Sequence, residues 1–136
     1  MSTEENKAIG PRFLKEQDRL KGVPGDELCA PNYTAYINGN PPMDREGHEQ
    51  MAHIFFGAFP DLNQTIEDTI AEGDKVVVRF TARGTHTGEL MGIPATNKSI
   101  KVGGIAIFRV VNGKVAEVYE QFDEMSMMQQ IGVIPA

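Results

Sequence analysis

The sequence predicts an α+β domain in which helices come first and a curved, mostly antiparallel sheet follows. Helix-forming segments at residues 11–20 and 44–59 lie in the first half of the chain, and four runs rich in β-branched residues fill the second half. The dipeptide Asn112-Gly113, a strong signal for a β-hairpin, separates the last two runs. Because helices and strands are segregated along the chain, we expect the helices to pack on the concave face of an antiparallel sheet.

Length, composition and charge set the class of protein. The chain has 136 residues, enough for one sizeable core, so we expect a single domain over residues 1–136. Its hydrophobic share of 40% and charged share of 24% are usual for globular proteins, and no apolar run reaches the roughly 20 residues of a membrane helix. With a net charge of -6, the chain lacks the basic stripe that nucleic acid requires. We therefore expect neither nucleic acid nor a membrane as a partner.

Helix formers and breakers organise the first half of the chain. Residues 1–7 are polar and acidic and lack the features of a secretory signal, so we expect a flexible tail and a cytoplasmic protein. Residues 11–20 follow as a helix whose start can lie upstream, and Asp26 is placed to cap a short helical piece that Pro31 ends. Residues 33–37 are expected to be extended.

The second predicted helix runs from an N-cap at Asp44 to Phe59. Its apolar side recurs at three- and four-residue spacing, at His48, Met51, Ala52, Phe55 and Phe56. This pattern predicts a helix that buries one side.

We expect no metal site. The single cysteine, Cys29, has no partner for an internal disulfide and no neighbouring Cys or His at ligand spacing, so it is expected to be a small buried side chain. His48 and His53 lie five residues apart, which does not place them on one helix face as a metal pair.

The second half of the chain is interpreted as four strands with tight turns at residues 72–74 and at Asn112-Gly113. The strands are expected over residues 63–71, 75–83, 98–110 and 114–122. Since side chains alternate along a strand, one face of the last strand carries Val115, Glu117, Tyr119, Gln121 and Asp123, and the opposite face carries Ala116, Val118, Glu120 and Phe122. The first of these faces is unusually polar, so it either meets water or lines a cavity.

Residues 84–98 resemble the strand-connecting signature of the SnoaL-like polyketide cyclases (ester cyclases), a branch of the NTF2-like superfamily. In this chain the stretch is GTHTGELMGIPATNK. The segment FPDL at residues 59–62 resembles the family's helix-to-strand junction, EGDKV at residues 72–76 resembles its first hairpin, and NGKVAEVY at residues 112–119 leads into its last strand. The segment QQIG at residues 129–132 is similar to the end of its C-terminal helix.

The resemblance implies a cone-shaped, NTF2-like (cystatin-like) α+β barrel whose sheet curves around N-terminal helices and leaves a cavity. It implies an enzyme that closes a ring of a polyketide ester by an intramolecular aldol step, without metal or organic cofactor. It also implies an aspartate general acid/base at the end of the last strand, where this chain has Asp123. We therefore expect a cofactor-free enzyme of cyclase or isomerase type that acts on a hydrophobic carbonyl compound.

Two roles remain open for Asp123. As a base it must lie within hydrogen-bond reach of the substrate in apolar surroundings that raise its pKa, and Phe122 and Met127 offer such neighbours. As the N-cap of a final helix it accepts a hydrogen bond from the amide of Met125 or Ser126. Capping lowers the pKa of a carboxyl group, so the two roles oppose each other.

The helpers of this carboxylate are the second open question. The resemblance implies a histidine in the sheet, but this chain has no histidine after His86. His86, in a Gly-rich turn, and His53, on the second helix, are the candidate catalytic histidines, and a packing role is the alternative for His86. Candidate donors to a developing enolate are Arg109, Gln121 and Tyr119.

The expected substrate-binding residues are aromatic, polar and flexible side chains near the proposed cavity. Aromatic residues at these spacings also suit plain core, and Arg79 is also placed to form a structural ion pair with Glu117. The set is Tyr33, Tyr36, Phe56, Phe59, Arg79, Arg109, Tyr119, Gln121 and Met127.

Two other function classes stay open. One is a small-molecule-binding module that kept the cone without its chemistry, which the missing sheet histidine favours. The other is a relative of the epoxide hydrolases, which need an arginine between two aspartates around a water molecule. Arg79 and Asp123 supply only part of that set, because Thr81 stands where an acid is needed.

A homodimer is expected through the convex face of the sheet. If the helices cover the concave face, the convex face exposes apolar residues such as Val77, Ile105 and Ile107. A symmetric dimer covers such a face, and the family resemblance also implies one.

Overall fold

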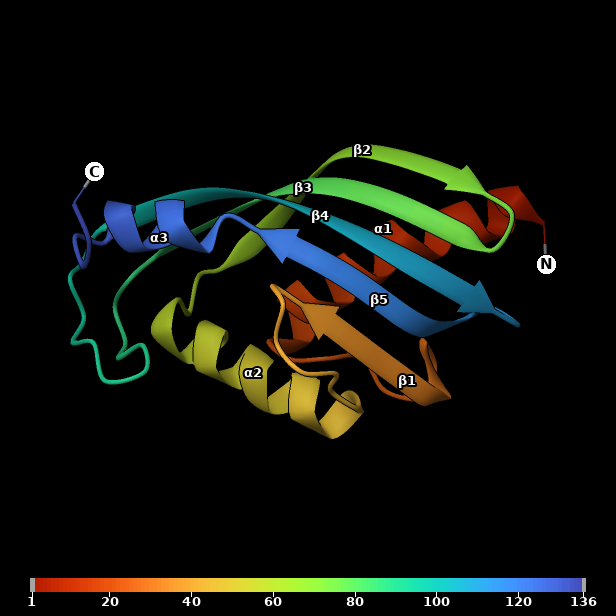
Figure 1. The fold of residues 1–136 in the computed structure, drawn as a ribbon, viewed down its shortest axis with the longest axis horizontal. Coiled ribbons are helices and arrows are strands. Elements are labelled where there is room, and N and C mark those ends of the chain that lie inside the picture. Colours follow the sequence, from red (N-terminus) through yellow and green to blue (C-terminus); the bar gives the residue numbers. More distant parts are fainter. Residues whose placement is uncertain (1, 136) are drawn as a thin grey trace.

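The structure, a computed structural model, describes residues 2–135. The elements in chain order are α1 (Thr3–Leu20), β1 (Cys29–Ile37), α2 (Arg45–Ala58), β2 (Asn63–Glu72), β3 (Lys75–Thr85), β4 (Ser99–Val111), β5 (Lys114–Phe122) and α3 (Glu124–Gln130). The strands form one five-stranded sheet in the order β1-β5-β4-β3-β2, in which only the β1–β5 pair is parallel (Figure 1). The predicted α+β class with a curved, mostly antiparallel sheet is confirmed.

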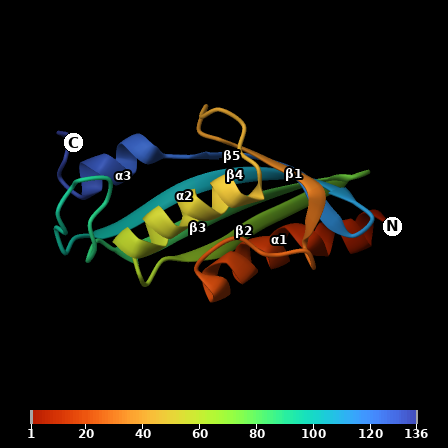
Figure 2. The ribbon, with the colours of Figure 1, turned by 90° about the horizontal axis from the view of Figure 1, so that it is seen from below.

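The sheet is open and curves around α1 and α2, which lie on its concave side (Figure 2). Helix α1 packs mainly against β2 and β3, α2 contacts β1, and α3 folds back onto β4. The two long helices therefore pack on different strands, and a cavity remains between α2 and the central strands.

Helix α1 begins at Thr3, so residues 3–7, expected to be a flexible tail, form its first turns. Ser2 and Glu5 form a capping box: the Ser2 hydroxyl accepts from the Glu5 amide, and the Ser2 amide donates to the Glu5 carboxylate, both at 3.1 Å. The expectation of a tail rested on polarity alone and overlooked the Ser-x-x-Glu signature of a helix start.

The predicted short helical piece at residues 26–29 is a turn, and Cys29 instead begins β1. Pro31 lies inside this strand, which is tolerated because β1 is an edge strand whose register with β5 is irregular between Cys29 and Thr34. Cys29 is buried as expected, and burial raises the pKa of its thiol to about 12. The N-cap of α2 at Asp44 is confirmed, since its carboxylate accepts from the Gly47 amide at 2.8 Å.

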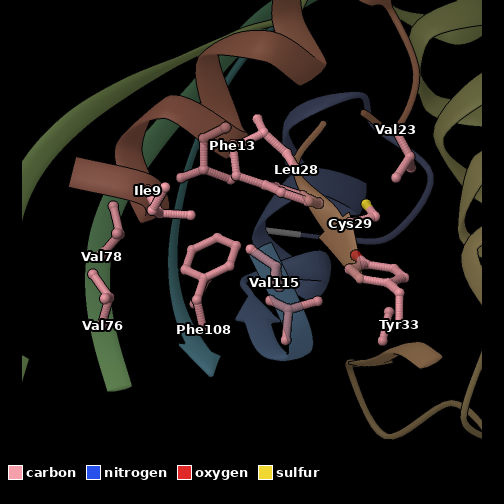
Figure 3. Close-up of a cluster of buried hydrophobic side chains, with 14 of the residues drawn as sticks. Ile9, Phe13, Val23, Leu28, Cys29, Tyr33, Val76, Val78, Phe108 and Val115 are labelled. Carbon is pink, nitrogen blue, oxygen red and sulfur yellow. The ribbon is translucent and has the colours of Figure 1, made fainter. Parts of the chain in front are cut away.

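The main hydrophobic core lies between α1 and the concave face of the sheet (Figure 3). Phe13 of α1 meets the ring of Phe108 of β4 at a centroid distance of 5.3 Å, and Val76 and Val78 of β3 are fully buried beside it. A second cluster around Phe59, Leu90 and Met127 closes the other end of the sheet. The space between the two clusters holds the candidate site.

Candidate active site

A cavity of about 100 Å³ lies between α2 and the concave face of the sheet. Its walls are mostly aliphatic and aromatic, and the few polar side chains in them are Gln17, His48, Gln64 and Glu120. The apolar lining comprises Ile37, Met51, Ala52, Phe55, Phe56, Phe59, Leu62, Phe80, Ala82, Ile100, Val102, Phe122 and Met127. An apolar cavity with a few polar groups is the usual form of a small-molecule site.

Alternation along β5 decides which of its side chains reach this cavity. Val118, Glu120 and Phe122 face the concave side, with Glu120 and Phe122 in the cavity wall, whereas Glu117, Tyr119 and Gln121 face the convex side. The polar face of the last strand therefore does not line the cavity. The face that does carries one acid among apolar neighbours.

Glu120 is a carboxyl group without a hydrogen-bond partner among residues 2–135. Burial alone raises its pKa to about 7, because the apolar wall cannot solvate the charged form as water does. The accessible part of its surface is intermediate, and the side chain opens onto the cavity that it lines. Near neutral pH, a carboxyl group with this pKa is populated both as the carboxylate, which can accept a proton, and as the carboxylic acid, which can donate one.

His48 of α2 is the second titratable group in the wall. Its Nδ1 lies 2.8 Å from the hydroxyl of Tyr33, and burial lowers the pKa of the imidazole to about 4, so the ring is neutral near pH 7. Burial also holds the pKa of Tyr33 well above its ordinary value, so this hydroxyl keeps its proton. Nδ1 of His48 is the hydrogen-bond partner of the Tyr33 hydroxyl, so the hydroxyl donates and Nδ1 accepts. We therefore assign the proton of the neutral imidazole to Nε2. Nε2–H is then the donor that His48 can offer to a ligand.

Asp123, the expected base, is exposed and lies outside the cavity lining. Its carboxylate accepts from the Ser126 amide at 3.0 Å and caps α3, which is the alternative role that the sequence had left open. The strand ends at Phe122, so the acid that follows it starts the helix and does not point back into the cone.

The two candidate catalytic histidines also lie outside the cavity lining. His53 is 64% exposed on α2, and its Nε2 lies 3.0 Å from the Glu49 carboxylate. His86 is fully buried beneath the loop at residues 86–98, where its Nδ1 accepts from the Thr96 amide at 3.2 Å and its ring packs on Phe59. His86 therefore lies where the sequence-based alternative of a packing role would place it.

Most of the expected polar binding residues lie on the convex face of the sheet. Tyr36 and Tyr119 stack there at a centroid distance of 4.4 Å, and Gln121 and Arg79 are exposed. Glu117 pairs with Arg109 at 2.8 Å, and not with Arg79 as the sequence had suggested. The Arg79 and Asp123 side chains required by an epoxide-hydrolase site do not meet in the cavity.

Three of the expected binding residues, Phe56, Phe59 and Met127, do lie in the cavity wall. Tyr33 lies behind the wall and reaches the cavity through His48. These positions are compatible with ligand binding, and the roles themselves stay predictions.

A comparison with protein-family models matches residues 12–131 to the family described as SnoaL-like polyketide cyclase. This chain belongs to that family. The match covers the second half of α1, all of α2, the whole sheet and all of α3.

Solved structures of similar fold agree with membership of the SnoaL-like family. AclR, a proposed hydroxylase from Streptomyces galilaeus, is 26% identical with a TM-score of 0.87, over 99% of this chain and 85% of AclR. IdmH, a proposed polyketide cyclase from Streptomyces antibioticus, is 28% identical with a TM-score of 0.77, over 97% of this chain and 99% of IdmH. A proposed SnoaL-like polyketide cyclase from Jannaschia sp. CCS1 is 23% identical with a TM-score of 0.85, over 98% of this chain and 95% of its own, and shows the shared fold. The comparison with curated proteins finds no match.

The SnoaL-like cavity of this chain contains four polar residues that sequence reasoning did not select: Gln17, His48, Gln64 and Glu120. Glu120 had a usable signal, because it is the one acid on the apolar face of β5, between Val118 and Phe122. The others carried no such signal, since their approach to the cavity depends on how α1, α2 and β2 are placed around it. Across residues 2–135, no group of three or more His, Cys, Asp or Glu side chains is arranged to hold a metal ion, and no helix is long and apolar enough to span a membrane.

Proposed function

We propose that this chain is a cofactor-free enzyme of polyketide cyclase (intramolecular aldol) or isomerase type that removes a proton next to a carbonyl in a hydrophobic compound. The observation that carries this proposal is the Glu120 carboxyl group, which has a pKa of about 7 in an apolar cavity. Abstraction of such a proton near neutral pH needs a base of about this pKa within reach of the carbon. Family membership supports the reaction class. The relatives include both a proposed hydroxylase and a proposed cyclase, so the reaction is argued from the residues of this chain.

The proposed reaction uses two side chains. The Glu120 carboxylate takes the proton from the carbon beside the carbonyl, and the electron pair of that bond forms an enolate. Nε2–H of neutral His48 donates a hydrogen bond to the enolate oxygen, which stabilises the developing charge in surroundings of low polarity. In an aldol closure the enolate carbon attacks a second carbonyl of the same molecule, and protonated Glu120 returns its proton to the resulting alkoxide. In an isomerisation it returns the proton to a different carbon.

Hydrogen–deuterium exchange at a ketone tests the proposed base without knowledge of the natural substrate. With 1-tetralone in D2O, we expect the wild-type protein to accelerate exchange of the protons beside the carbonyl, as followed by NMR. Glu120→Gln removes the base and should lower this rate at least about 100-fold, a typical contribution of general acid–base catalysis. The rate should rise with pH through the pKa of Glu120, about 7.

Asp123→Asn is the matched control, because Asn caps a helix about as well as Asp and Asp123 lies outside the cavity lining. We expect it to keep the wild-type exchange rate. Loss of exchange in Asp123→Asn with full activity in Glu120→Gln would overturn the assignment of the base. Binding of 1-tetralone with no exchange above buffer would instead support the binding-module alternative.

We also propose that two copies of the chain pair through the convex face of the sheet. In register, Ile70, Val77, Ile107, Tyr119 and Tyr36 form one apolar row across all five strands. Ile70 is 61% exposed and Tyr119 is 47% exposed, which is unusual for a sheet face of a monomer. The flanking rows carry both charges, with Arg79 opposite Asp68 and Arg109 paired with Glu117, so the face is complementary in charge to a copy of itself.

A further inference from the structure

Gln17 of α1 is a buried amide that the protein itself does not use. The residue is 7% exposed and lies in the cavity wall, and its side chain has no hydrogen-bond partner among residues 2–135. The polar atoms of its side chain are not among those shut off from solvent without a partner, so they open onto the cavity. The Gln17 amide therefore offers both a donor and an acceptor to a molecule that enters the cavity.

Gln64 of β2 lines the same cavity as Gln17 and has a fixed orientation. Its Nε2 donates to the Leu14 carbonyl at 3.3 Å and to the Asp18 carboxylate at 3.0 Å, and its backbone amide donates to the same carboxylate at 2.8 Å. Both hydrogens of the side-chain amide are used on acceptors, so its Oε1 is the group left for a ligand. Lys15 donates to the backbone carbonyl of Gln64 and pairs with the Asp18 carboxylate, which holds this arrangement in place.

The helix places the two amides together. Gln17 follows Leu14 by three residues, so the two lie on one face of α1, and the Gln64 side chain bonds to that face. The pair therefore offers a ligand one fixed acceptor, Gln64 Oε1, and one adaptable amide, Gln17, which can donate. A hydroxyl group satisfies both, because it donates one hydrogen bond and accepts another.

The amide pair and Glu120 occupy opposite corners of the cavity. Gln64 on β2 pairs with Ala82, which pairs with Val102, whereas Glu120 pairs with Ala106 two rows away along the sheet. Three strand spacings of about 4.8 Å separate β2 from β5, before the side chains reach inward. The wall between the two corners is apolar, with Phe80 and Phe122 at its centre.

From this placement we infer that Gln17 and Gln64 form a hydroxyl-binding subsite, so that the ligand is a hydrophobic carbonyl compound with a hydroxyl group at the end remote from the reacting carbonyl. The carbonyl half of this inference rests on the proposed function, and the hydroxyl half does not. Because a ligand that lacks the hydroxyl covers the Gln17 amide and Gln64 Oε1 without bonding to either, we expect a preference of about tenfold or more for the hydroxylated ligand.

Three bicyclic ketones test the subsite by binding alone, with dissociation constants measured by calorimetry. The probes are 1-tetralone, 6-hydroxy-1-tetralone and 6-methoxy-1-tetralone, in which the added group lies at the far end of the ring system from the carbonyl. We expect the hydroxy compound to bind wild-type protein about tenfold more tightly than 1-tetralone. We expect no such gain for the methoxy compound, because a methoxy oxygen accepts but cannot donate to Gln64 Oε1.

Gln17→Met removes the adaptable amide at nearly constant volume, and Gln50→Met, on the exposed side of α2, is the matched control. We expect the hydroxyl preference to fall to about threefold or less in Gln17→Met and to persist in Gln50→Met. The melting temperature of Gln17→Met should equal or exceed that of the wild type, since the replaced amide has no partner in the protein. A lower melting temperature would assign Gln17 a structural role and overturn the inference.

Equal binding of 1-tetralone and its hydroxy derivative by the wild type, or an undiminished preference in Gln17→Met, would also overturn it. The two proposals fail separately. A hydroxyl preference without exchange at the ketone would refute the base chemistry and leave the subsite standing. Exchange that depends on Glu120 without a hydroxyl preference would do the reverse.

Discussion

The fold buries the carboxyl group of Glu120 in an apolar wall, although its charged form is more stable in water. Its pKa in the folded protein is about 7, above the 4.5 of the free side chain, so between these values the folded state holds a proton that the unfolded state has lost. Stability from this residue is therefore fully present below pH 4.5 and is lost as the pH rises through 7. The proposed base therefore makes the protein less stable at the neutral pH at which its carboxylate form is populated.

Glu120→Gln should remove this dependence, because glutamine is neutral at every pH. In urea unfolding, we expect the variant to gain on the order of 2–3 kcal/mol relative to wild type between pH 5 and pH 8. Asp123→Asn leaves the Glu120 carboxyl in place, so its free energy of unfolding should depend on pH as that of the wild type does. If the free energy of unfolding of Glu120→Gln depended on pH as in the wild type, the pKa of Glu120 in the wild type would not be raised by burial.

Sequence reasoning identified the strand that lines the cavity but selected an acid, Asp123, that lies outside the cavity lining. The hairpin at Asn112-Gly113 predicted β5, and alternation separated its two faces from Glu117 to Phe122 as the structure has them. Val115, expected on the face of Glu117, is instead in the core, because the register with β4 shifts at Ala116. The polar face was favoured for the cavity because polar residues do chemistry, yet a site that shifts a pKa needs apolar surroundings, and Glu120 has these. The positions of Gln17 and Gln64 follow from packing between elements distant in sequence, which no local pattern encodes.

At the scale of elements, the contact of α1 with the sheet depends on a glycine. A Cβ atom on Gly10 would lie 2.9 Å from both Val76 Cγ1 and Val78 Cγ2, and 3.3 Å from Phe108 Cδ2. Alanine is a better helix former than glycine by about 1 kcal/mol, but overpacking of a core costs about 1–3 kcal/mol. Because α1 lies so close to β3, we expect the cost of overpacking to outweigh the gain in helix propensity at Gly10.

Gly10→Ala should lower the free energy of unfolding by up to about 2 kcal/mol in urea titrations. Gly57→Ala is the matched control, since Gly57 is an exposed helix residue of α2 with no atom within 4 Å of the added Cβ. We expect that control to gain about 0.5–1 kcal/mol. A gain in both variants would show that α1 can move away from β3 without loss.

The elements themselves were largely predictable. Turn chemistry and period-two patterns predicted β2 to β5 to within a few residues, and the Asp44 cap predicted the start of α2. The start of α1 and the extent of β1 were not predicted, because the capping box was overlooked and Pro31 was interpreted as a breaker although an edge strand tolerates it.

For the whole molecule, the order of helices and strands was enough to predict the class, since segregated elements favour one helical layer on one sheet. The cavity was not predictable in the same way. It arises because α1 and α2 pack on different strands of the concave face, and their placement is set by the summed contacts of the core and not by any single motif. Both long helices lie on the concave side (Figure 2), so the convex face carries neither of them, and this is the physical basis of the proposed pairing of copies.

Ile107 lies in the middle of the apolar row on that convex face and is 37% exposed. If the row is the interface, a lysine there places a charge opposite its own copy near the symmetry axis and leaves it desolvated, which is strongly unfavourable. We expect light scattering to give about twice the chain mass of 15.0 kDa for the wild type and the single-chain mass for Ile107→Lys. Ile54→Lys is the control, because Ile54 is similarly exposed, at 44%, but lies on α2 away from the sheet face, and it should leave the dimer intact. A single-chain mass for the wild type, or dissociation by both variants alike, would refute pairing through the sheet.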